Sequence, residues 1–229
     1  MDWTLAIRRN REALMRILAA LCALVGLPED GPAGNSHLPR HLHAHARRIL
    51  RAAEAAIRRL IVIAAREVVV QPAGVRPDLA ALGKGVEPAG AQATLRIPAF
   101  PLLDPLKRFS FEPPRRASKF MPRICVVGFT EPAPLPQKPV VSPDDPVDAT
   151  GLCSRLLSSR RALANLPREA RRLARWYQRN RLRSRPGRVM PLRMGRPPGG
   201  RKRPIHRVDD VLKECHALAL DVLSPPDSS

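Results

Sequence analysis

Arginine side chains dominate residues 167–183, and they are the groups of this chain best suited to chemistry with another molecule. A planar guanidinium group donates paired hydrogen bonds that match the oxygens of a phosphate. Two aromatic rings stand among these arginines and could stack on bases. The sequence therefore predicts a nucleic-acid contact made by Arg168, Arg171, Arg172, Arg175, Trp176, Tyr177, Arg179 and Arg183. The alternative is a solvated basic face with both rings in a small core.

A second basic group follows in a stretch rich in glycine and proline. Its sequence is Arg193-Met194-Gly195-Arg196-Pro197-Pro198-Gly199-Gly200-Arg201-Lys202-Arg203-Pro204, which resembles an AT-hook. The resemblance implies an extended Gly-Arg-Pro core in the narrow minor groove of A·T-rich DNA, which attracts arginine. Met194 stands where that family has an arginine, and a generic basic loop is the alternative. The predicted nucleic-acid contacts here are Arg193, Arg196, Arg201, Lys202 and Arg203.

Other residues whose side chains could take part in chemistry do not form a recognisable site. Histidines occur at positions 37, 41, 43 and 45, and His41 and His45 would lie one helical turn apart. No acidic residue or cysteine stands among them to complete a metal site, so we expect no metal and no cofactor. The sequence also lacks the phosphate-loop, serine-hydrolase and zinc-peptidase motifs, so we expect no enzymatic activity.

Charge is concentrated in one part of the chain. The net charge is +20, and residues 151–207 carry 18 lysines and arginines but a single acidic residue, Glu169. A GC-rich genome explains arginine in place of lysine, but it does not explain this one-sided distribution. Such a block repels itself and favours counter-anions, so its predicted partner is nucleic acid or another polyanion.

The elements that must position these residues are helices. Apolar residues recur at helical spacing in residues 4–27, 41–70 and 208–223. Asp145 and Pro146 form a helix-start signal before a further, basic pair of helices. We predict a mostly α fold, with two helical hairpins and a C-terminal amphipathic helix separated by a proline-rich, largely irregular segment. The predicted parts are an N-terminal helical hairpin (1–70), the proline-rich segment (71–146), a basic helical hairpin (147–184), a basic loop (185–207), and an amphipathic helix with its tail (208–229).

The proline-rich segment allows two interpretations. It is a linker, or it is a docking segment in which residues 97–130 bind a protein partner. Short extended pieces are predicted near residues 94–97 and 124–129. The anchors of a docking segment would be Phe100, Leu102, Leu103, Phe109 and Phe111.

The apolar run Ile17–Leu27 is shorter than the roughly 20 residues that cross a bilayer. The four cysteines are widely spaced, as is typical of reduced thiols. We therefore expect a cytoplasmic protein. The alternative is peripheral association with an anionic inner membrane, with the helix around Leu14–Leu27 lying in its surface.

The chain as a whole resembles uncharacterised arginine- and proline-rich proteins of GC-rich bacterial genomes. The resemblance rests on Leu38-Pro39-Arg40, on Leu60-Ile61-Val62-Ile63-Ala64-Ala65-Arg66 and on Arg171-Arg172-Leu173-Ala174-Arg175-Trp176. It implies no function. The residues themselves predict a non-enzymatic accessory protein that binds nucleic acid through residues 151–207. Because residues 208–229 are acidic, the last helix is a candidate to fold over the basic helices and mask them.

Overall fold

The structure, a computed structural model, describes residues 2–27, 37–69, 97–106, 142–182 and 190–223. Of these residues 67% are helical, so the predicted mostly α fold is confirmed. The described residues within 1–105 and 143–229 form one compact unit. Arg183, the extended piece predicted at 124–129, most of the piece at 94–97, and the anchors Phe109 and Phe111 lie outside the described residues.

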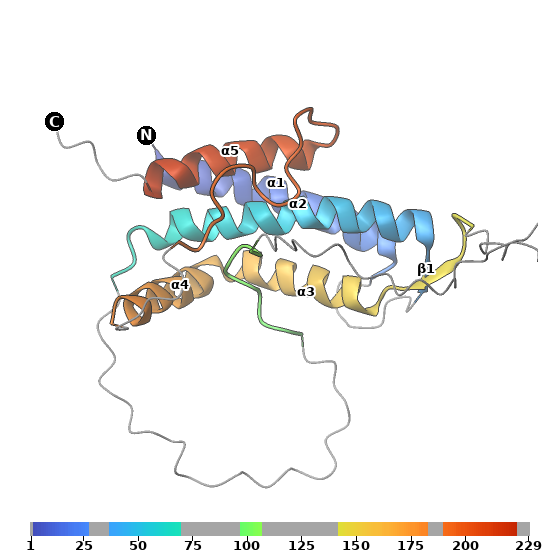
Figure 1. Ribbon diagram of the computed structural model, residues 1–229, viewed down its shortest axis with the longest axis horizontal. Helices are drawn as coiled ribbons and strands as arrows, with labels where there is room; N and C mark the ends of the chain where they lie inside the picture. Colours follow the sequence, from blue (N-terminus) through green and yellow to red (C-terminus); the bar gives the residue numbers. More distant parts are fainter. Residues whose placement is uncertain (1, 28–36, 70–96, 107–141, 183–189, 224–229) are drawn as a thin grey trace, which may run out of the picture. The chain divides into compact units, whose positions relative to one another are not determined.

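Helix α2 (Arg40–Ala65) is the centre of this unit. It contacts α1 (Trp3–Val25), α3 (Thr150–Ala164), α4 (Leu166–Arg181) and α5 (Arg207–Leu223), as Figure 1 shows. Every residue from Ala52 to Ile63 is buried, including three charged ones. A helix that is buried on all sides must satisfy such charges within the protein.

Small side chains allow the other helices to approach α2 closely. Its buried residues include five alanines, and the distance between packed helices depends on the side chains at the contact. The alanine-rich, aromatic-poor composition of the chain therefore fits a core of closely packed helices. The five alanines are Ala46, Ala52, Ala53, Ala55 and Ala56.

Helix α1 lies antiparallel to α2 (Figure 1). The Asp2 carboxylate accepts a hydrogen bond from the Leu5 backbone N–H at 3.0 Å, which caps the N-terminus of α1. Gly26 ends the helix in the left-handed conformation, with φ of +69°. Most of the apolar face predicted for this helix is buried in the core, including Leu14, Leu18 and Leu21, whereas Leu24 is exposed.

The start of α3 differs from the prediction. Residues Pro146–Asp148 form strand β2, which pairs antiparallel with β1 (His37–Pro39), so that Leu38 faces Val147. Their backbone is therefore used in a sheet and not in the first helical turn. The helix begins at Thr150, where the Asp148 carboxylate accepts hydrogen bonds from the Thr150 N–H and hydroxyl at 2.9 and 2.6 Å.

Helices α3 and α4 follow one another with a single-residue break at Asn165. Both pack on α2, and their contacts with each other are few by comparison. The expected basic hairpin thus takes the form of two consecutive helices on a common support. Pro167 fits the first turn of α4, where a missing N–H costs nothing.

Helix α5 begins one residue before the predicted position and buries the predicted apolar face against its neighbours. It packs on α2 and α1, and its Glu214 forms an ion pair with Arg9 of α1. The arginines that it was expected to mask on α4 are exposed, so the masking hypothesis is wrong for Arg168, Arg171, Arg175 and Arg179.

Candidate nucleic-acid interface

Four of the predicted contact residues form a straight row on α4, which we call the α4 stripe: Arg168, Arg171, Arg175 and Arg179. All four side chains are exposed. They follow at intervals of three, four and four residues, so they share one face over about 16 Å of helix. That face lies opposite Leu166, Ala170 and Leu173, which pack towards the core. The stripe therefore points away from α2.

Arg172 belongs to a different environment. Its Nη1 donates to the Glu169 carboxylate at 2.7 Å and to the Phe100 carbonyl oxygen at 2.9 Å. It thus ties the segment 97–106 to α4. Glu169 is the single acidic residue of the basic block, and it pairs with Arg172. No other carboxylate of α4 is therefore present to offset the positive charge of the α4 stripe.

The sequence predicts that Trp176 and Tyr177 stack on bases. Both are half-buried and pack against the core, with ring centroids 5.2 Å apart and planes at 62°. The Tyr177 hydroxyl is buried and has no hydrogen-bond partner among the described residues. Burial raises the pKa of Tyr177 to about 12. This arrangement matches the alternative of a small core under a basic face.

A titration of Tyr177 tests this burial, because the chain has one tyrosine. Phenolate absorbance should appear near pH 12 in the folded protein, since burial raises the pKa from its ordinary value of 10.0. In guanidinium chloride the midpoint should return to the ordinary value. Burial of the neutral phenol stabilises the fold fully at pH values below the pKa of Tyr177 in the unfolded state. This contribution is lost as the pH rises towards the pKa in the folded state. Equal midpoints in the two states would contradict the burial.

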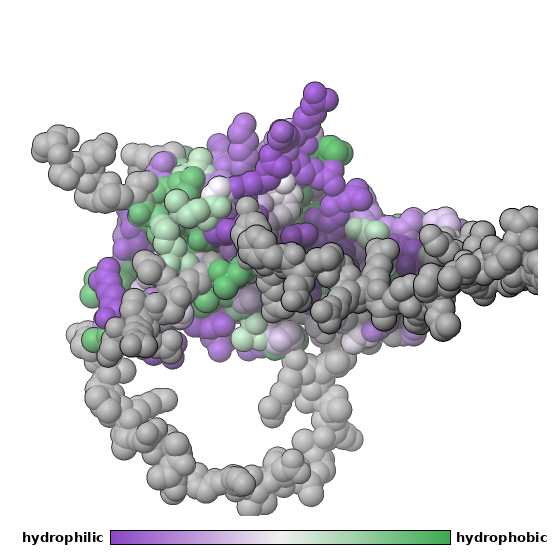
Figure 2. Space-filling view, viewed as in Figure 1, coloured by the Kyte–Doolittle hydropathy of each residue, from purple (hydrophilic) through white to green (hydrophobic). Residues whose placement is uncertain are grey.

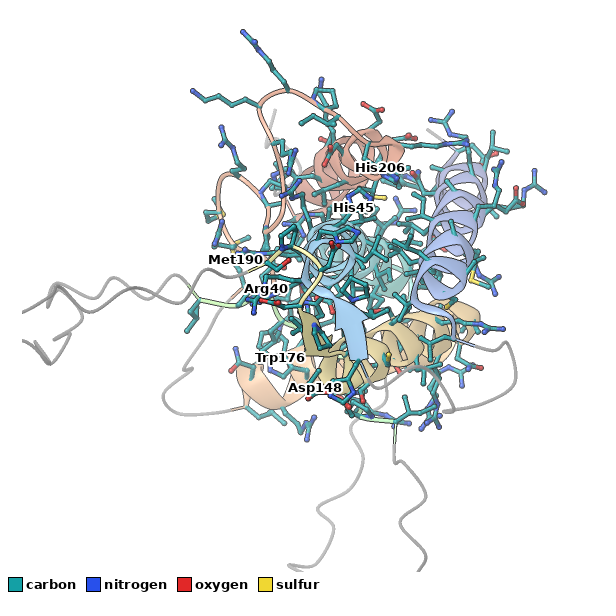
Figure 3. The ribbon with its side chains drawn as sticks, turned by 90° about the vertical axis from the view of Figure 1, so that its right-hand side faces the viewer. Arg40, His45, Asp148, Trp176, Met190 and His206 are labelled. Carbon is teal, nitrogen blue, oxygen red and sulfur yellow. The ribbon has the colours of Figure 1, made fainter. Side chains whose placement is uncertain are left out.

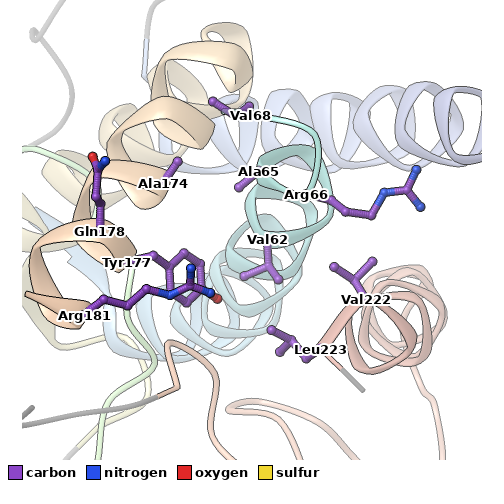
Figure 4. Close-up of a pocket in the computed structure, with 10 residues that line it drawn as sticks. All are labelled: Val62, Ala65, Arg66, Val68, Ala174, Tyr177, Gln178, Arg181, Val222 and Leu223. Carbon is purple, nitrogen blue, oxygen red and sulfur yellow. The ribbon is translucent and has the colours of Figure 1, made fainter. Parts of the chain in front are cut away.

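A cavity of about 500 Å³ lies behind Tyr177, between the ends of α2, α4 and α5 (Figure 4). Its walls combine apolar side chains with the polar ones of Gln178, Arg66 and Arg181. Arg66 contributes to the lining, but its guanidinium group lies 4.6 Å from the centre of the Trp3 ring and pairs with Glu67. The cavity is on a different side of α4 from the stripe. Its lining residues are Val62, Ala65, Arg66, Val68, Ala174, Tyr177, Gln178, Arg181, Val222 and Leu223.

The other predicted contacts lie in the loop between α4 and α5. Four of these side chains are exposed, and the loop forms a hydrophilic projection in Figure 2: Arg196, Arg201, Lys202 and Arg203. Arg193 is half-buried, and its Nη2 donates to the Arg196 carbonyl oxygen at 2.8 Å. Its backbone N–H donates to the Asp104 carboxylate at 3.2 Å.

Gly199 fixes this loop on α2. Its φ is +84°, and a Cβ built there would lie 2.9 Å from the Cα and N of Ala52. Pro198 beside it is buried. The loop is thus a turn packed on a helix, which differs from the extended core that an AT-hook resemblance implies. The packing also brings the loop to Arg51, an exposed arginine of α2 that was not among the predicted contacts.

A buried ionic cluster, which was not predicted from the sequence, holds the loop at Pro191 and Arg193. The Asp104 side chain is 0% exposed, and it accepts from Arg58 Nε at 2.7 Å and from Arg59 Nη2 at 3.0 Å. Arg59, also 0% exposed, donates to the Ala55 carbonyl oxygen at 2.7 Å and to His216 Nδ1 at 3.1 Å. The Asp104 N–H donates to the Pro191 carbonyl oxygen at 2.9 Å. The cluster therefore joins α2, α5, the segment 97–106 and the loop.

The protonation states of this cluster follow from its surroundings. Burial alone would raise the pKa of Asp104, but the charges of Arg59 and Arg58 outweigh it and hold that pKa below its ordinary value. Burial and the nearby Arg59 lower the pKa of His216. The carboxylate is thus ionised between two cations, and the imidazole stays neutral so that it can accept from Arg59.

The structure does not bring the predicted contact residues into one site. They form two groups, the α4 stripe and the loop between α4 and α5, and segment 97–106 contacts both α4, through Arg172, and the loop, through Pro191 and Arg193. Figure 3 labels Trp176 on α4, Met190 where the described part of the loop begins and His206 where the loop ends. Comparison of the chain with models of known protein families, with curated proteins and with solved structures finds no match.

Proposed function

We propose that this protein is a non-enzymatic accessory protein that binds nucleic acid along its phosphate backbone. The observation that carries this proposal is the α4 stripe, because four guanidinium groups are exposed in a row and the nearby Glu169 is paired with Arg172. Contacts of this kind go to phosphates and carry little sequence information, so binding is expected to be largely non-specific.

The dimensions of the stripe suit a nucleic-acid backbone. Its groups recur every 5–6 Å or so along the helix, whereas duplex DNA carries one negative charge per roughly 1.7 Å of axis. Each guanidinium group therefore has a phosphate within reach along a duplex that lies against α4. Each contact releases counterions, which makes the affinity strongly dependent on salt.

A membrane surface is the weaker candidate for the partner. A helix that binds in the lipid interface needs a free apolar face. The apolar faces of α1 and α4 are buried against the rest of the unit. Within the described residues, no helix combines the length and the apolar character that a membrane crossing demands.

The adaptor alternative also loses two of its anchors. Phe100 and Leu102, expected to bind a protein partner, are buried in the core of this chain. What is left of that interpretation rests on Leu103, which is half-buried, and on residues 107–130, which lie outside the described residues. A cytoplasmic location is part of the proposal, and the reduced thiols of Cys153 and Cys215 fit a reducing compartment.

Charge-matched variants test the proposal. In R171Q/R175Q the stripe loses two phosphate contacts, so the slope of log affinity against log salt should become shallower by about 1.8, and affinity at low salt should fall roughly 10- to 100-fold. Fluorescence anisotropy with a short DNA duplex and the matching RNA duplex measures both quantities.

The control is R8Q/R16Q, which removes two exposed arginines of α1 that flank Glu12. It changes the net charge by the same amount outside the stripe, and its slope should stay near that of the native protein. The proposal fails if the native protein binds neither duplex, or if the two variants behave alike.

A further inference from the structure

The cavity behind Tyr177, which we call the Tyr177 cavity, has two walls of different character. Helix α4 contributes a polar wall, with the Tyr177 hydroxyl and the side chains of Gln178 and Arg181. Its volume of about 500 Å³ is within the range of roughly 300–1,000 Å³ that is usual for small-molecule sites. The opposite wall comes from the ends of α2 and α5 and is made largely of apolar residues: Val62, Ala65, Val68, Val222 and Leu223.

Two polar groups of the α4 wall lack a partner within the described part of the chain. The Tyr177 hydroxyl is buried without a hydrogen bond, and the exposed Arg181 side chain forms no hydrogen bond or ion pair there. The two residues are four positions apart on α4, so their side chains are neighbours. Burial raises the pKa of Tyr177, and the charge of Arg181 acts in the opposite direction. The guanidinium group is therefore close enough to the hydroxyl for both to contact one acceptor.

The charge of the cavity suits a ligand with a single negative charge. The second arginine of the lining, Arg66, extends away from Tyr177 in Figure 4, and its guanidinium group is held by the Trp3 ring and by Glu67. Among the described lining residues, Arg181 is thus the cation left for a ligand. A carboxylate can accept two parallel hydrogen bonds from a guanidinium group. A doubly charged phosphate would keep one charge without a counter-charge in a partly apolar site.

We propose that the Tyr177 cavity binds a small organic carboxylate, with its apolar body against α2 and α5 and its carboxylate held by Arg181 and the Tyr177 hydroxyl. A buried hydroxyl without a partner costs stability, and a bound acceptor removes that cost. Water fits the space less well, because an ordered water needs about two to four polar partners and one wall is apolar. This site lies on a different side of α4 from the α4 stripe, so the inference goes beyond the proposed function and does not depend on it.

Equilibrium dialysis of the full chain against 2-naphthoate at physiological salt tests the proposal. The matched ligand is 2-naphthamide, which has nearly the same shape and no charge. The native protein should bind 2-naphthoate saturably at one site and the amide at least about 10-fold more weakly, because the amide forms no charge-assisted hydrogen bond.

A pair of charge-matched variants separates the site from the net charge of the chain. R181Q should weaken 2-naphthoate binding by about 10-fold or more and leave 2-naphthamide binding unchanged. The control is R47Q, which removes an exposed arginine of α2 that precedes Val62 by 15 residues, or about 22 Å of helix. It should change the affinity for 2-naphthoate by less than about 2-fold, since general attraction by many charges is screened by salt.

Two further variants test the hydroxyl and the space. Tyr177→Phe should weaken 2-naphthoate binding roughly 3- to 10-fold. Without ligand its free energy of unfolding, measured with urea, should not fall, because the hydroxyl has no partner to lose. Ala174→Phe places a ring in the cavity and should abolish binding of both ligands, with the fold checked by circular dichroism.

Several outcomes would overturn the proposal. The native protein would show no saturable binding of 2-naphthoate, or it would bind the amide equally well. R181Q and R47Q would behave alike, which would reduce the effect to general attraction by a basic chain. Tyr177→Phe would lose stability but keep its affinity, which would make the hydroxyl a structural group. A folded Ala174→Phe that binds like the native protein would place the ligand elsewhere.

Discussion

Replacement of Asp104 by asparagine should lower the free energy of unfolding by about 3–5 kcal/mol, the usual cost of breaking a buried ion pair from one side. The exchange keeps the shape of the side chain but leaves Arg58 and Arg59 without their shared anion, and both are nearly inaccessible to water. Urea denaturation followed by circular dichroism measures the change.

The matched control for this variant is Asp144→Asn. Asp144 also pairs with a basic group, His41, but its side chain is 78% exposed. Exposed pairs contribute little, so the control should cost less than about 1 kcal/mol. Similar losses for the two variants would mean that the cluster around Asp104 is not the buried anchor that the structure describes.

The same carboxylate gives the protein a defined response to acid. Because its pKa is lowered in the folded state, its stabilising contribution is present above the ordinary pKa of an aspartate and is lost as pH falls through the folded value. The native protein should therefore lose more stability than Asp104→Asn between neutral and strongly acidic pH. Denaturation curves at a series of pH values measure the difference, and parallel losses would contradict this assignment.

Replacement of Gly199 by alanine is the second large expected effect, at about 2–4 kcal/mol. The new Cβ would lie at 2.9 Å from two backbone atoms of Ala52, and the residue would keep a φ of +84°. A backbone atom of a buried helix cannot move aside cheaply, so the loop has to lift from α2.

Gly195 in the same loop provides the control. Its φ of +73° imposes a similar backbone cost, but nothing lies within 4 Å of a Cβ built there. Gly195→Ala should cost about 1 kcal/mol, which is the penalty of the left-handed conformation alone. The difference between the two variants isolates the contact with α2. If both variants cost the same, Gly199 does not anchor the loop.

The helices could be predicted from the sequence because each presents an apolar face at helical spacing. That spacing identifies which face is buried, but not which element covers it. For this reason α3 and α4 were expected to pair with each other, whereas both pack on α2. The start of α3 was misplaced for a similar reason, since a three-residue strand at Pro146 has no detectable period.

The charged residues of the candidate site could be predicted from the sequence, but their arrangement in space could not. The exposed α4 stripe follows from the helix and its arginines, but sequence alone could not separate Arg172 from the rest. The sequence also contains a signal for the buried ionic cluster, which the prediction did not use. Arg58 and Arg59 directly precede the apolar run from Leu60, and Asp104 stands alone among Phe100, Leu102 and Leu103. Opposite charges in apolar surroundings indicate a buried pair.

The position of Arg59 also sets the order in which the chain can fold. Its three partners are four residues away at Ala55, 45 at Asp104 and 157 at His216, so its burial needs contacts between distant parts of the sequence. Contacts of such long range form slowly, because a large loop must close before they contribute. On the ribosome, the N-terminal two helices emerge long before α5 exists. Arg59 therefore cannot complete its set of partners until α5 has been synthesised, although Asp104 becomes available earlier.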